Sequence, residues 1–370
     1  MVGRYAAAAV CTPGLEQICS DELARLGCRP KPAGPGTVEF SANARQLYSA
    51  NVWLRTASRI MIEVGRFRAT DFAHLERAVA AIDWSPWVRQ EVAPAFRVTS
   101  KESKLYHTEA VAERLHRQIG PPATPGQTKQ LIIVRIKRNT VTMRVDSSGE
   151  ALHLRPWRTE TGPAPLRTTM AAAMLQLGGW SGAATLVDPF CGSGTIAIEA
   201  ALQARDMPAG GQRSYAFEHW DDYEPGTWGS VSGEVAARRK AACAAPILAS
   251  DSDSAQVSRA TRNAERAGVV DDIEFSTRPV TDLQPHFGPG HIISNPPYGK
   301  RVGGQRLGAL YKQFGSLARE RMAGSDLTIV CADGNLAMRA DRNFKNVASF
   351  RHGGLRVAVR HRGASNRTTD

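Results

Sequence analysis

The chain has 370 residues, 42% of them hydrophobic and 22% charged, with a formal net charge of +12 and a sequence pI near 9.7. The length predicts more than one domain, the composition excludes a wholly disordered chain, and no apolar run reaches membrane-spanning length. The six cysteines form no C-x-x-C pair and no zinc-finger spacing, so we expect no metal and no disulfide framework. Both halves of the chain are basic, which suits a polyanionic partner such as nucleic acid.

The first part of the chain mixes short strands and helices. Residues 1–10 lack the long apolar core of a secretion signal and fit a buried first strand, so we expect a cytoplasmic protein without a membrane partner. Apolar periodicity predicts a helix from Leu15 to Leu26 that ends at Gly27. The further predicted elements are strands at 6–11, 60–64 and 96–99, helices at 72–82 and 108–119, a hairpin of 131–136 and 141–145 around Asn139-Thr140, and a strand at 151–157.

After residue 158 the pattern changes. Residues 159–165 contain two prolines and a glycine and form the best candidate for a linker. Short apolar strands then alternate with helical segments, which is typical of a parallel, doubly wound α/β sheet. The predicted strands are 185–187, 247–249, 273–275, 292–294 and 327–331, with helices at 255–267 and 307–322 among them.

The first chemical motif is a glycine turn at the end of the first of these strands. Residues 185–195 read as a buried strand, a turn and the start of a helix, and Gly192 and Gly194 allow close approach of a ligand to the backbone. Ala197 stands where a dinucleotide fingerprint needs its third glycine, and no Gly-Lys-Ser/Thr follows as in a Walker loop. Asp188 would repel a pyrophosphate but attract a cationic ligand. The turn therefore predicts an S-adenosyl-L-methionine site.

A second acidic segment, Asp251-Ser252-Asp253, follows the next strand. We expect Asp251 to accept hydrogen bonds from ribose hydroxyls and Asp253 to cap the following helix. The alternative, that both carboxylates serve only as helix caps, stays open.

The second chemical motif, Asn295-Pro296-Pro297-Tyr298, ends a later strand. An exocyclic base amine is a poor nucleophile because its lone pair is delocalised into the ring. The Asn295 amide oxygen and the Pro296 carbonyl can each accept one amine hydrogen and direct the lone pair at a methyl group. Two prolines stiffen the backbone, and Tyr298 offers a face on which a base can stack. We therefore interpret these four residues as the catalytic site, in which orientation supplies most of the rate.

The chain resembles the THUMP-domain RNA guanine-N2 methyltransferases, among them the amino-terminal methylase half of RlmL and the tRNA enzymes of the TrmN type. The strings that carry the resemblance are Thr12–Glu16 (TPGLE), Leu152–Arg158 (LHLRPWR), Ala164–Arg167 (APLR), Asp188–Thr195 (DPFCGSGT), Ala216–Trp220 (AFEHW) and Asn295–Gly299 (NPPYG). They extend over nearly the whole chain. The family's usual Arg-Gly-Tyr-Arg is Arg-Pro-Trp-Arg here.

The resemblance implies a carboxyl-terminal class I, Rossmann-like methyltransferase domain and an α+β amino-terminal region for RNA binding. It implies a ferredoxin-like subdomain at 1–59, a THUMP domain at 60–158, a linker at 159–166 and the methyltransferase domain at 167–370. Family members carry an acidic residue near the cofactor adenine where this chain has Pro279, and Asp282 is the nearby substitute. The predicted cofactor residues are Asp188, Pro189, Phe190, Gly192, Ser193, Gly194, Thr195, Asp251 and Asp282.

Several basic and aromatic residues lie outside these motifs. Lys300 and Arg301 directly follow the amine motif and are placed to hold substrate phosphate. Arg135, Lys137, Arg138 and Arg144 on the hairpin are candidates for an RNA face. Trp220 and Trp228 fit packing against a sheet edge better than a base pocket, and the arginines from Arg351 onward fit either phosphate contact or a solvated strand.

The sequence thus predicts methylation of an exocyclic amine, guanine N2 in structured rRNA or tRNA. Adenine-N6 methylation of nucleic acid uses the same amine motif, as do glutamine methyltransferases that act on release factors. A glutamine methyltransferase would leave the basic amino-terminal half unexplained, and a DNA enzyme would need a target-recognition domain. A non-catalytic RNA-binding protein with a degenerate cofactor site is the alternative from another class, and cofactor binding would separate it from an enzyme.

Overall fold

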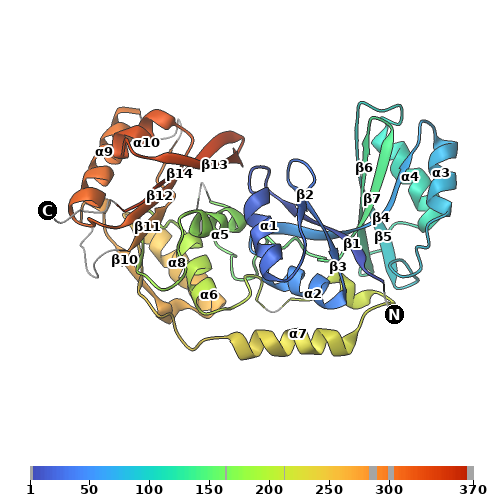
Figure 1. Ribbon diagram of the computed structural model, residues 1–370, viewed down its shortest axis with the longest axis horizontal. Coiled ribbons are helices and arrows are strands. Elements are labelled where there is room, and N and C mark those ends of the chain that lie inside the picture. The colour runs from blue at the N-terminus through green and yellow to red at the C-terminus, as the bar shows by residue number, and fades with distance from the viewer. Residues whose placement is uncertain (1–2, 163–164, 212, 283–289, 299–303, 365–370) are drawn as a thin grey trace. The chain divides into compact units, whose positions relative to one another are not determined.

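The computed structural model describes residues 3–162, 165–211, 213–282, 290–298 and 304–364. The chain divides into two compact units (Figure 1). Unit 1 comprises residues 1–11, 20–152 and 212–233, and unit 2 comprises 12–19, 153–211 and 234–370. The return of 212–233 to unit 1 lies outside any boundary that the sequence suggested, because this segment sits between strands of the carboxyl-terminal sheet in the chain.

Unit 1 is built on one mixed sheet with the strand order β2-β3-β1-β4-β7-β6-β5. Its strands are β1 (Tyr5–Cys11), β2 (Lys31–Pro32), β3 (Thr37–Ala42), β4 (Ala57–Arg68), β5 (Val92–Lys101), β6 (Thr128–Lys137) and β7 (Thr140–Asp146). Its helices are α2 (Ala44–Trp53), α3 (Phe72–Ala80) and α4 (Thr108–Ile119), together with the second half of α1 (Glu16–Arg25). The predicted hairpin is confirmed, but its turn is Arg138-Asn139 rather than Asn139-Thr140, because Thr140 already begins β7. Arg138 and Asn139 both have positive φ, which is the two-residue turn that matches strand twist.

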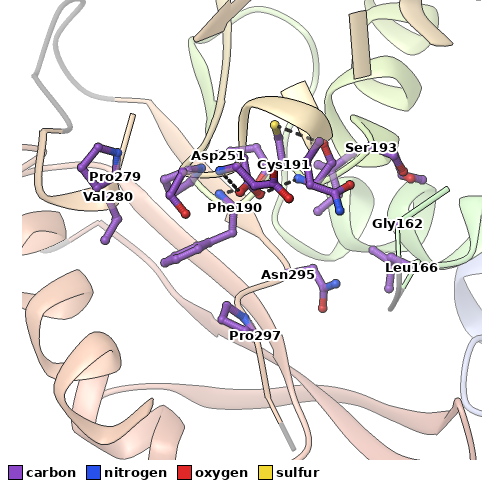
Figure 2. Close-up of a pocket in the computed structure, with 18 of the residues that line it drawn as sticks. Gly162, Leu166, Phe190, Cys191, Ser193, Asp251, Pro279, Val280, Asn295 and Pro297 are labelled. Carbon is purple, nitrogen blue, oxygen red and sulfur yellow. Dashed lines mark hydrogen bonds between the residues drawn. The ribbon is translucent and has the colours of Figure 1, made fainter. Parts of the chain in front are cut away.

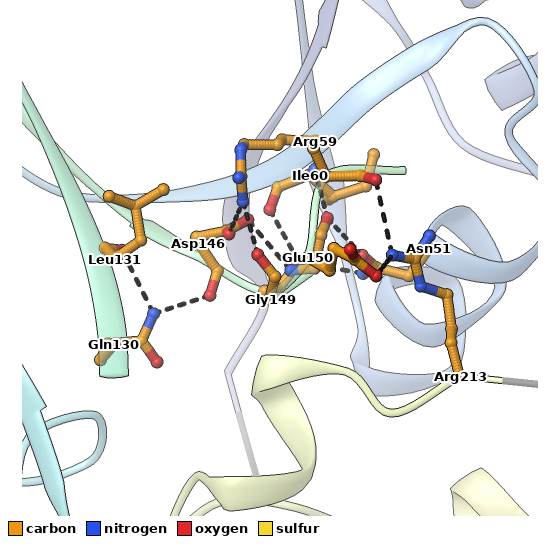
Figure 3. A network of polar contacts seen from close by, with 12 residues as sticks. Asn51, Arg59, Ile60, Gln130, Leu131, Asp146, Gly149, Glu150 and Arg213 are labelled. Carbon is orange, nitrogen blue, oxygen red and sulfur yellow. Dashed lines mark hydrogen bonds and ion pairs between the residues drawn. The ribbon is translucent and has the colours of Figure 1, made fainter. Parts of the chain in front are cut away.

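A buried polar network joins three parts of unit 1 (Figure 3). Asp146, fully buried at the end of β7, pairs with Arg59 of β4, whose guanidinium also donates to the Gly149 carbonyl at 2.7 Å. The Asn51 amide of α2 donates to the Ser147 hydroxyl at 2.9 Å. Burial raises the pKa of Asp146 to about 6 despite its cationic partner. Satisfied polar groups of this kind favour a single arrangement of helix, strand and turn.

The segment 212–233 brings an aromatic cluster to unit 1. Trp228 contacts Tyr48, Tyr215 and Phe217, and the Trp220 indole nitrogen donates to the Gln130 amide oxygen at 2.8 Å. Trp220 is only 3% exposed. The preferred interpretation of these tryptophans as packing residues is therefore confirmed.

Unit 2 contains a second sheet with the order β10-β9-β8-β11-β12-β14-β13. The strands β8 (Leu186–Asp188), β9 (Ile247–Asp251), β10 (Ile273–Thr277), β11 (His291–Ser294) and β12 (Asp326–Cys331) run parallel, as predicted. The hairpin of β13 (Lys345–His352) and β14 (Leu355–Arg362) adds an antiparallel edge. The helices are α5 (Thr168–Leu177), α6 (Thr195–Ala204), α8 (Ser254–Ala267), α9 (Gly304–Glu320) and α10 (Gly334–Ala340). Of α7 (Pro225–Arg238), residues 225–233 belong to unit 1 and residues 234–238 to unit 2. Short 3-10 turns cover Ala216–His219, Val270–Asp272 and Val280–Asp282.

Both faces of this parallel sheet are buried, which explains why its strands read as continuous apolar runs. Leu186 and Ile293 join the core on the side of α5, α6 and α8. Their neighbours Val187 and Ile292 join the core on the side of α9 and α10. The strands β8, β9 and β11 are neighbours and run parallel, so their carboxyl ends meet at one edge of the sheet.

The predicted strand at 151–157 is wrong. These residues form turns, and the His153 carbonyl accepts a hydrogen bond from the Thr168 hydroxyl at 2.8 Å instead of a strand partner. Leu152 and Leu154 alternate in the sequence, but Leu154 is 50% exposed, whereas Arg155 and Trp157 are buried in unit 2.

Candidate functional site

A cavity of about 530 Å³ opens at the carboxyl ends of β8, β9 and β11 within unit 2 (Figure 2). Its volume lies in the range of about 300–1,000 Å³ that is typical of small-ligand sites. The lining combines the glycine turn, the segment after β9, the turn after β10, the amine motif and the end of the predicted linker. Among the predicted residues, those that line it are Asp188, Pro189, Phe190, Gly192, Ser193, Thr195, Asp251, Asn295 and Pro297.

The two glycines of the turn have different structural roles. Gly192 has φ +53°, and a Cβ built there would meet nothing within 4 Å. Gly194 has φ +81°, and its Cβ would come within 2.9 Å of the Ala260 Cβ on α8. Gly192 therefore leaves the backbone open toward the cavity, whereas Gly194, outside the lining, lets α6 begin close against α8.

Two carboxylates give this end of the cavity its negative character. Asp188 is 1% exposed and accepts hydrogen bonds from the Ser294 hydroxyl and, at 3.3 Å, from the Phe190 N–H. Burial, and secondarily the nearby charge of Asp251, raise the pKa of Asp188 to about 7. Asp251 accepts the Gly192 N–H at 3.0 Å and the Asp253 N–H at 3.0 Å. Asp251 thus ties the turns after β8 and β9 together.

The amine motif faces this turn. Figure 2 shows the Asn295 side chain between the glycine turn above it and Pro297 below it. The Asn295 amide oxygen is buried and has no hydrogen-bond partner within the part of the chain that the structure describes. Pro296 is buried, and Tyr298 packs against the cores on both faces of the sheet, where burial raises its pKa to about 12. A buried acceptor without a donor indicates a ligand group that supplies one.

The far end of the cavity is shaped by the turn after β10. Pro279, Val280 and Thr281 line it. Asp282 is exposed, lies outside the lining and accepts a hydrogen bond from its neighbour Thr281 at 3.0 Å. The structure therefore brings Pro279, rather than Asp282, to the place beside the predicted cofactor.

The predicted linker forms one wall of the cavity. Gly162 and Leu166 line it, and a Cβ on Gly162 would come within 2.7 Å of the Gln256 amide. Asn263 of α8, fully buried, donates to the Glu160 carbonyl at 2.9 Å and to the Ser193 carbonyl at 3.1 Å. One amide therefore holds both the linker and the glycine turn.

The sequence did not predict the role of Asn263, because nothing in the local sequence indicates that this polar residue of a helix is buried. It also missed the partner of Arg155. This residue forms a buried ion pair with Glu199 of α6 at 2.9 Å, with both side chains at most 1% exposed. The pair connects the segment before the linker to the helix that the glycine turn begins. A buried charged pair across distant segments can be recognised only in three dimensions.

Of the predicted RNA contacts, Arg135, Lys137 and Arg138 lie in unit 1 and not in the cavity lining. Arg135 and Lys137 are exposed on β6, and Arg138 in the adjoining turn forms an ion pair with Glu102 at 3.0 Å. Lys300 and Arg301 lie outside the described residues. Among the side chains that are described, no group of three or more His, Cys, Asp or Glu is arranged to hold a metal ion. No helix in the described ranges is long and apolar enough to cross a membrane.

The comparisons with known proteins agree with this architecture. Residues 7–61 match an RlmL ferredoxin-like domain. The Ribosomal RNA large subunit methyltransferase K/L of Shewanella amazonensis is 35% identical over 352 residues, which cover 90% of this chain and 50% of that protein. The chain thus spans about half the length of the curated relatives it matches.

Solved structures extend the likeness to three dimensions. The methyltransferase SMU.472, solved in complex with SAH, has a TM-score of 0.89 and 27% identity, and the match covers 98% of this chain and 99% of that one. TrmN from Thermus thermophilus has a TM-score of 0.73 at 22% identity over 97% of this chain and 99% of that one, which establishes the shared fold. Residues 155–355, more than half of the chain, match the RMKL-like methyltransferase domain, and the chain therefore belongs to this family of methyltransferases.

Proposed function

We propose that this chain transfers a methyl group from S-adenosyl-L-methionine to the exocyclic N2 of a guanine in large-subunit ribosomal RNA. The observation that carries the proposal is the Asn295 amide oxygen, buried without a hydrogen-bond partner among the described residues, in the same cavity as the glycine turn. The relative from Shewanella bears a name that assigns large-subunit ribosomal RNA to it, which favours ribosomal RNA over tRNA.

The cavity fits the proposed cofactor. Its volume suits a nucleoside-sized ligand, the open backbone at Gly192 allows close approach, and Asp188 and Asp251 offer negative charge to a sulfonium and an amino group. SMU.472, solved with SAH, supports the same assignment. When bound, S-adenosyl-L-methionine supplies an electrophilic methyl group. The residues to hold it are those of the glycine turn with Asp251, and Pro279 and Val280 would contact the adenine.

The chain's own contribution is to orient the base amine. The Asn295 amide oxygen and the Pro296 carbonyl would each accept one hydrogen of the amine, which directs its lone pair into the cavity and stabilises the positive charge that develops on nitrogen. Tyr298 would support the base from the side. The released proton can pass to water after transfer, so the site needs no strong base, and orientation supplies most of the rate.

The amino-terminal unit would bind the RNA. The proposed division is a ferredoxin-like part at 1–59 and a THUMP domain at 60–158, of which residues 12–19 and 153–158 belong to unit 2, with Arg135, Lys137 and Arg138 among the RNA contacts. The residue-60 boundary falls inside β4, which runs from Ala57 to Arg68. Ribosomal RNA as substrate implies a cytoplasmic location for the enzyme.

The test is a methylation assay with the full chain, labelled S-adenosyl-L-methionine, and protein-free ribosomal RNA or tRNA, followed by digestion to nucleosides. We expect label in N2-methylguanosine from ribosomal RNA. Asn295→Ala should lower the turnover by about 10²–10³, the scale seen when one group that stabilises transition-state charge is removed. Binding of the cofactor, measured by calorimetry, and of RNA should change little.

Asn335→Ala is the matched control, because Asn335 is an exposed asparagine on α10 outside the cavity. Its turnover should equal that of the unmodified chain. Label in N6-methyladenosine would show that the substrate base is adenine and not guanine. No label and no cofactor binding in the unmodified chain would leave only RNA binding and reject the enzymatic proposal.

A further inference from the structure

The sheet of unit 1 has one face covered by helices and one face without them among the described residues. Phe96 on the covered side contacts His116 of α4, and the buried residues Ile132 and Val134 of β6 face the same way. On the opposite face the alternate residues of β3, of β6 and of the first half of β7 are exposed or half-buried, whereas Ala8, Met61 and Asp146 are buried there. An exposed sheet face of this kind is available for a partner.

A groove of about 340 Å³ crosses this face at β1, β2, β3 and β4. Its lining includes five cations and two carboxylates, and Ala6 and Ala8 of β1 give it a floor of small side chains. The cations are Arg4, Arg29, Lys31, Arg66 and Arg144, and the carboxylates are Glu39 and Glu63. The groove therefore carries an excess of positive charge.

The two carboxylates are already engaged within the groove. Glu63 accepts hydrogen bonds from Arg66 at 2.8 Å and from Arg144 at 3.1 Å. Glu39 accepts one from Arg144 at 2.8 Å and one from Arg66 at 3.2 Å. Because both arginines hold Glu63 in its charged form, the pKa of this carboxyl is lowered despite its partial burial.

The remaining cations have no acidic partner within the described ranges. Arg4 bonds only neutral groups, the Ser41 hydroxyl at 2.8 Å and the Gln46 amide oxygen at 3.2 Å. Arg29 and Lys31 are exposed and form no ion pair in the part of the chain described. These charges are therefore free to meet an anionic ligand.

Strand register extends the basic surface beyond the groove. Arg66 lies opposite Thr142 of β7, and Thr142 lies opposite Arg135 of β6. Paired residues in neighbouring strands project from the same face. The groove and the exposed Arg135 therefore belong to one basic surface that spans β2 to β6.

We propose that this groove binds the phosphate backbone of the RNA substrate, as a contact separate from the methyl-transfer cavity. The inference rests on the proposed function and names where unit 1 holds that substrate. Guanidinium and ammonium groups along a groove floored by small side chains suit the regularly spaced phosphates of an RNA strand. Such contacts bind the backbone and are independent of the base sequence. An acidic protein segment would be the competing occupant, and the salt dependence of RNA binding separates the two.

The test compares the full chain with the double variant Arg29→Gln/Lys31→Gln and with Arg117→Gln. Arg117 is a matched control because it is an exposed arginine, 59% accessible, on α4, the helix that covers the other face of the sheet. Affinity for protein-free large-subunit ribosomal RNA is measured by filter binding over a series of KCl concentrations. Each lost phosphate contact should lower the slope of log affinity against log salt by about 1.

We expect the double variant to bind this RNA about tenfold more weakly at low salt, with a slope reduced by about 1 to 2. Arg117→Gln should match the unmodified chain, and all three should bind S-adenosyl-L-methionine equally. Unchanged affinity and slope in the double variant would overturn the proposal, whatever the methylation assay gives. Conversely, if the double variant loses RNA affinity but the unmodified chain methylates no RNA, the proposed function is rejected and the groove is still an RNA-binding site.

Discussion

Asp188 is a buried carboxyl group in the cavity lining, and its pKa is strongly raised. It ends β8 inside the protein, and its carboxylate contacts the Ser294 hydroxyl and the Phe190 N–H but no cation among the described residues. Burial therefore raises its pKa from 3.8 to about 7. With the ligand absent, the folded state binds this proton more tightly than the unfolded state, so Asp188 makes stability fall as pH rises from about 4 to 7.

This shift predicts that cofactor affinity depends on pH. The ionised carboxylate attracts the sulfonium, and its population grows about tenfold between pH 6 and pH 8 for a pKa near 7. Affinity for S-adenosyl-L-methionine, measured by calorimetry, should therefore rise about tenfold over this range. Asp188→Asn should bind with an affinity that hardly changes with pH. If the variant keeps the rise, another group is responsible and the role of Asp188 is wrong.

At the level of elements, the glycine turn requires glycine for two physical reasons, a left-handed backbone and close packing against a neighbouring helix. Gly192 needs its left-handed φ, whereas Gly194 also needs the space that Ala260 of α8 occupies. Asn263, one turn further along α8, binds the Ser193 carbonyl from the same helix. The position of α8 therefore determines the shape of the turn.

We predict that Gly194→Ala destabilises the chain by about 1–3 kcal/mol, because its Cβ overlaps Ala260 in addition to the strained φ. Gly192→Ala should cost about 1 kcal/mol, since only the left-handed backbone is unfavourable there. Urea denaturation of both variants gives the comparison. In a double-mutant cycle, Ala260→Gly should recover part of the loss at Gly194 and none at Gly192. Equal losses without coupling would contradict the packing role.

At the scale of the whole molecule, the net charge of +12 lies over both units. We expect RNA affinity to fall linearly on a log–log plot against salt, because bound cations release counterions from phosphate. If six or more phosphates are contacted, affinity should drop about 10³-fold between 50 and 200 mM salt. Filter binding of ribosomal RNA to the unmodified chain measures this. A flat response would mean that phosphates contribute little to the interface.

The sequence alone determined the class of fold and two segments of the cavity lining, the glycine turn and the amine motif. Continuous apolar strands such as β8 and β11 predict a parallel sheet buried on both faces, and parallel strands end at one edge. Asp188 and Asn295 each follow such a strand, so they were expected to meet without any knowledge of the contacts between them. The predicted strand at 151–157 failed because these residues form turns, in which Leu154 is exposed and Arg155 and Trp157 are buried.

Only the tertiary structure decided which residues support that cavity and where else a ligand can bind. Asn263 and the Arg155–Glu199 pair join segments far apart in the chain, and Pro279 rather than Asp282 reaches the lining. The groove brings Arg29 and Lys31, at the start of β2, to the same surface as Arg66 of β4, and strand pairing sets this arrangement. Local patterns report how each residue alternates between buried and exposed, but they carry no information on which distant residue lies opposite it.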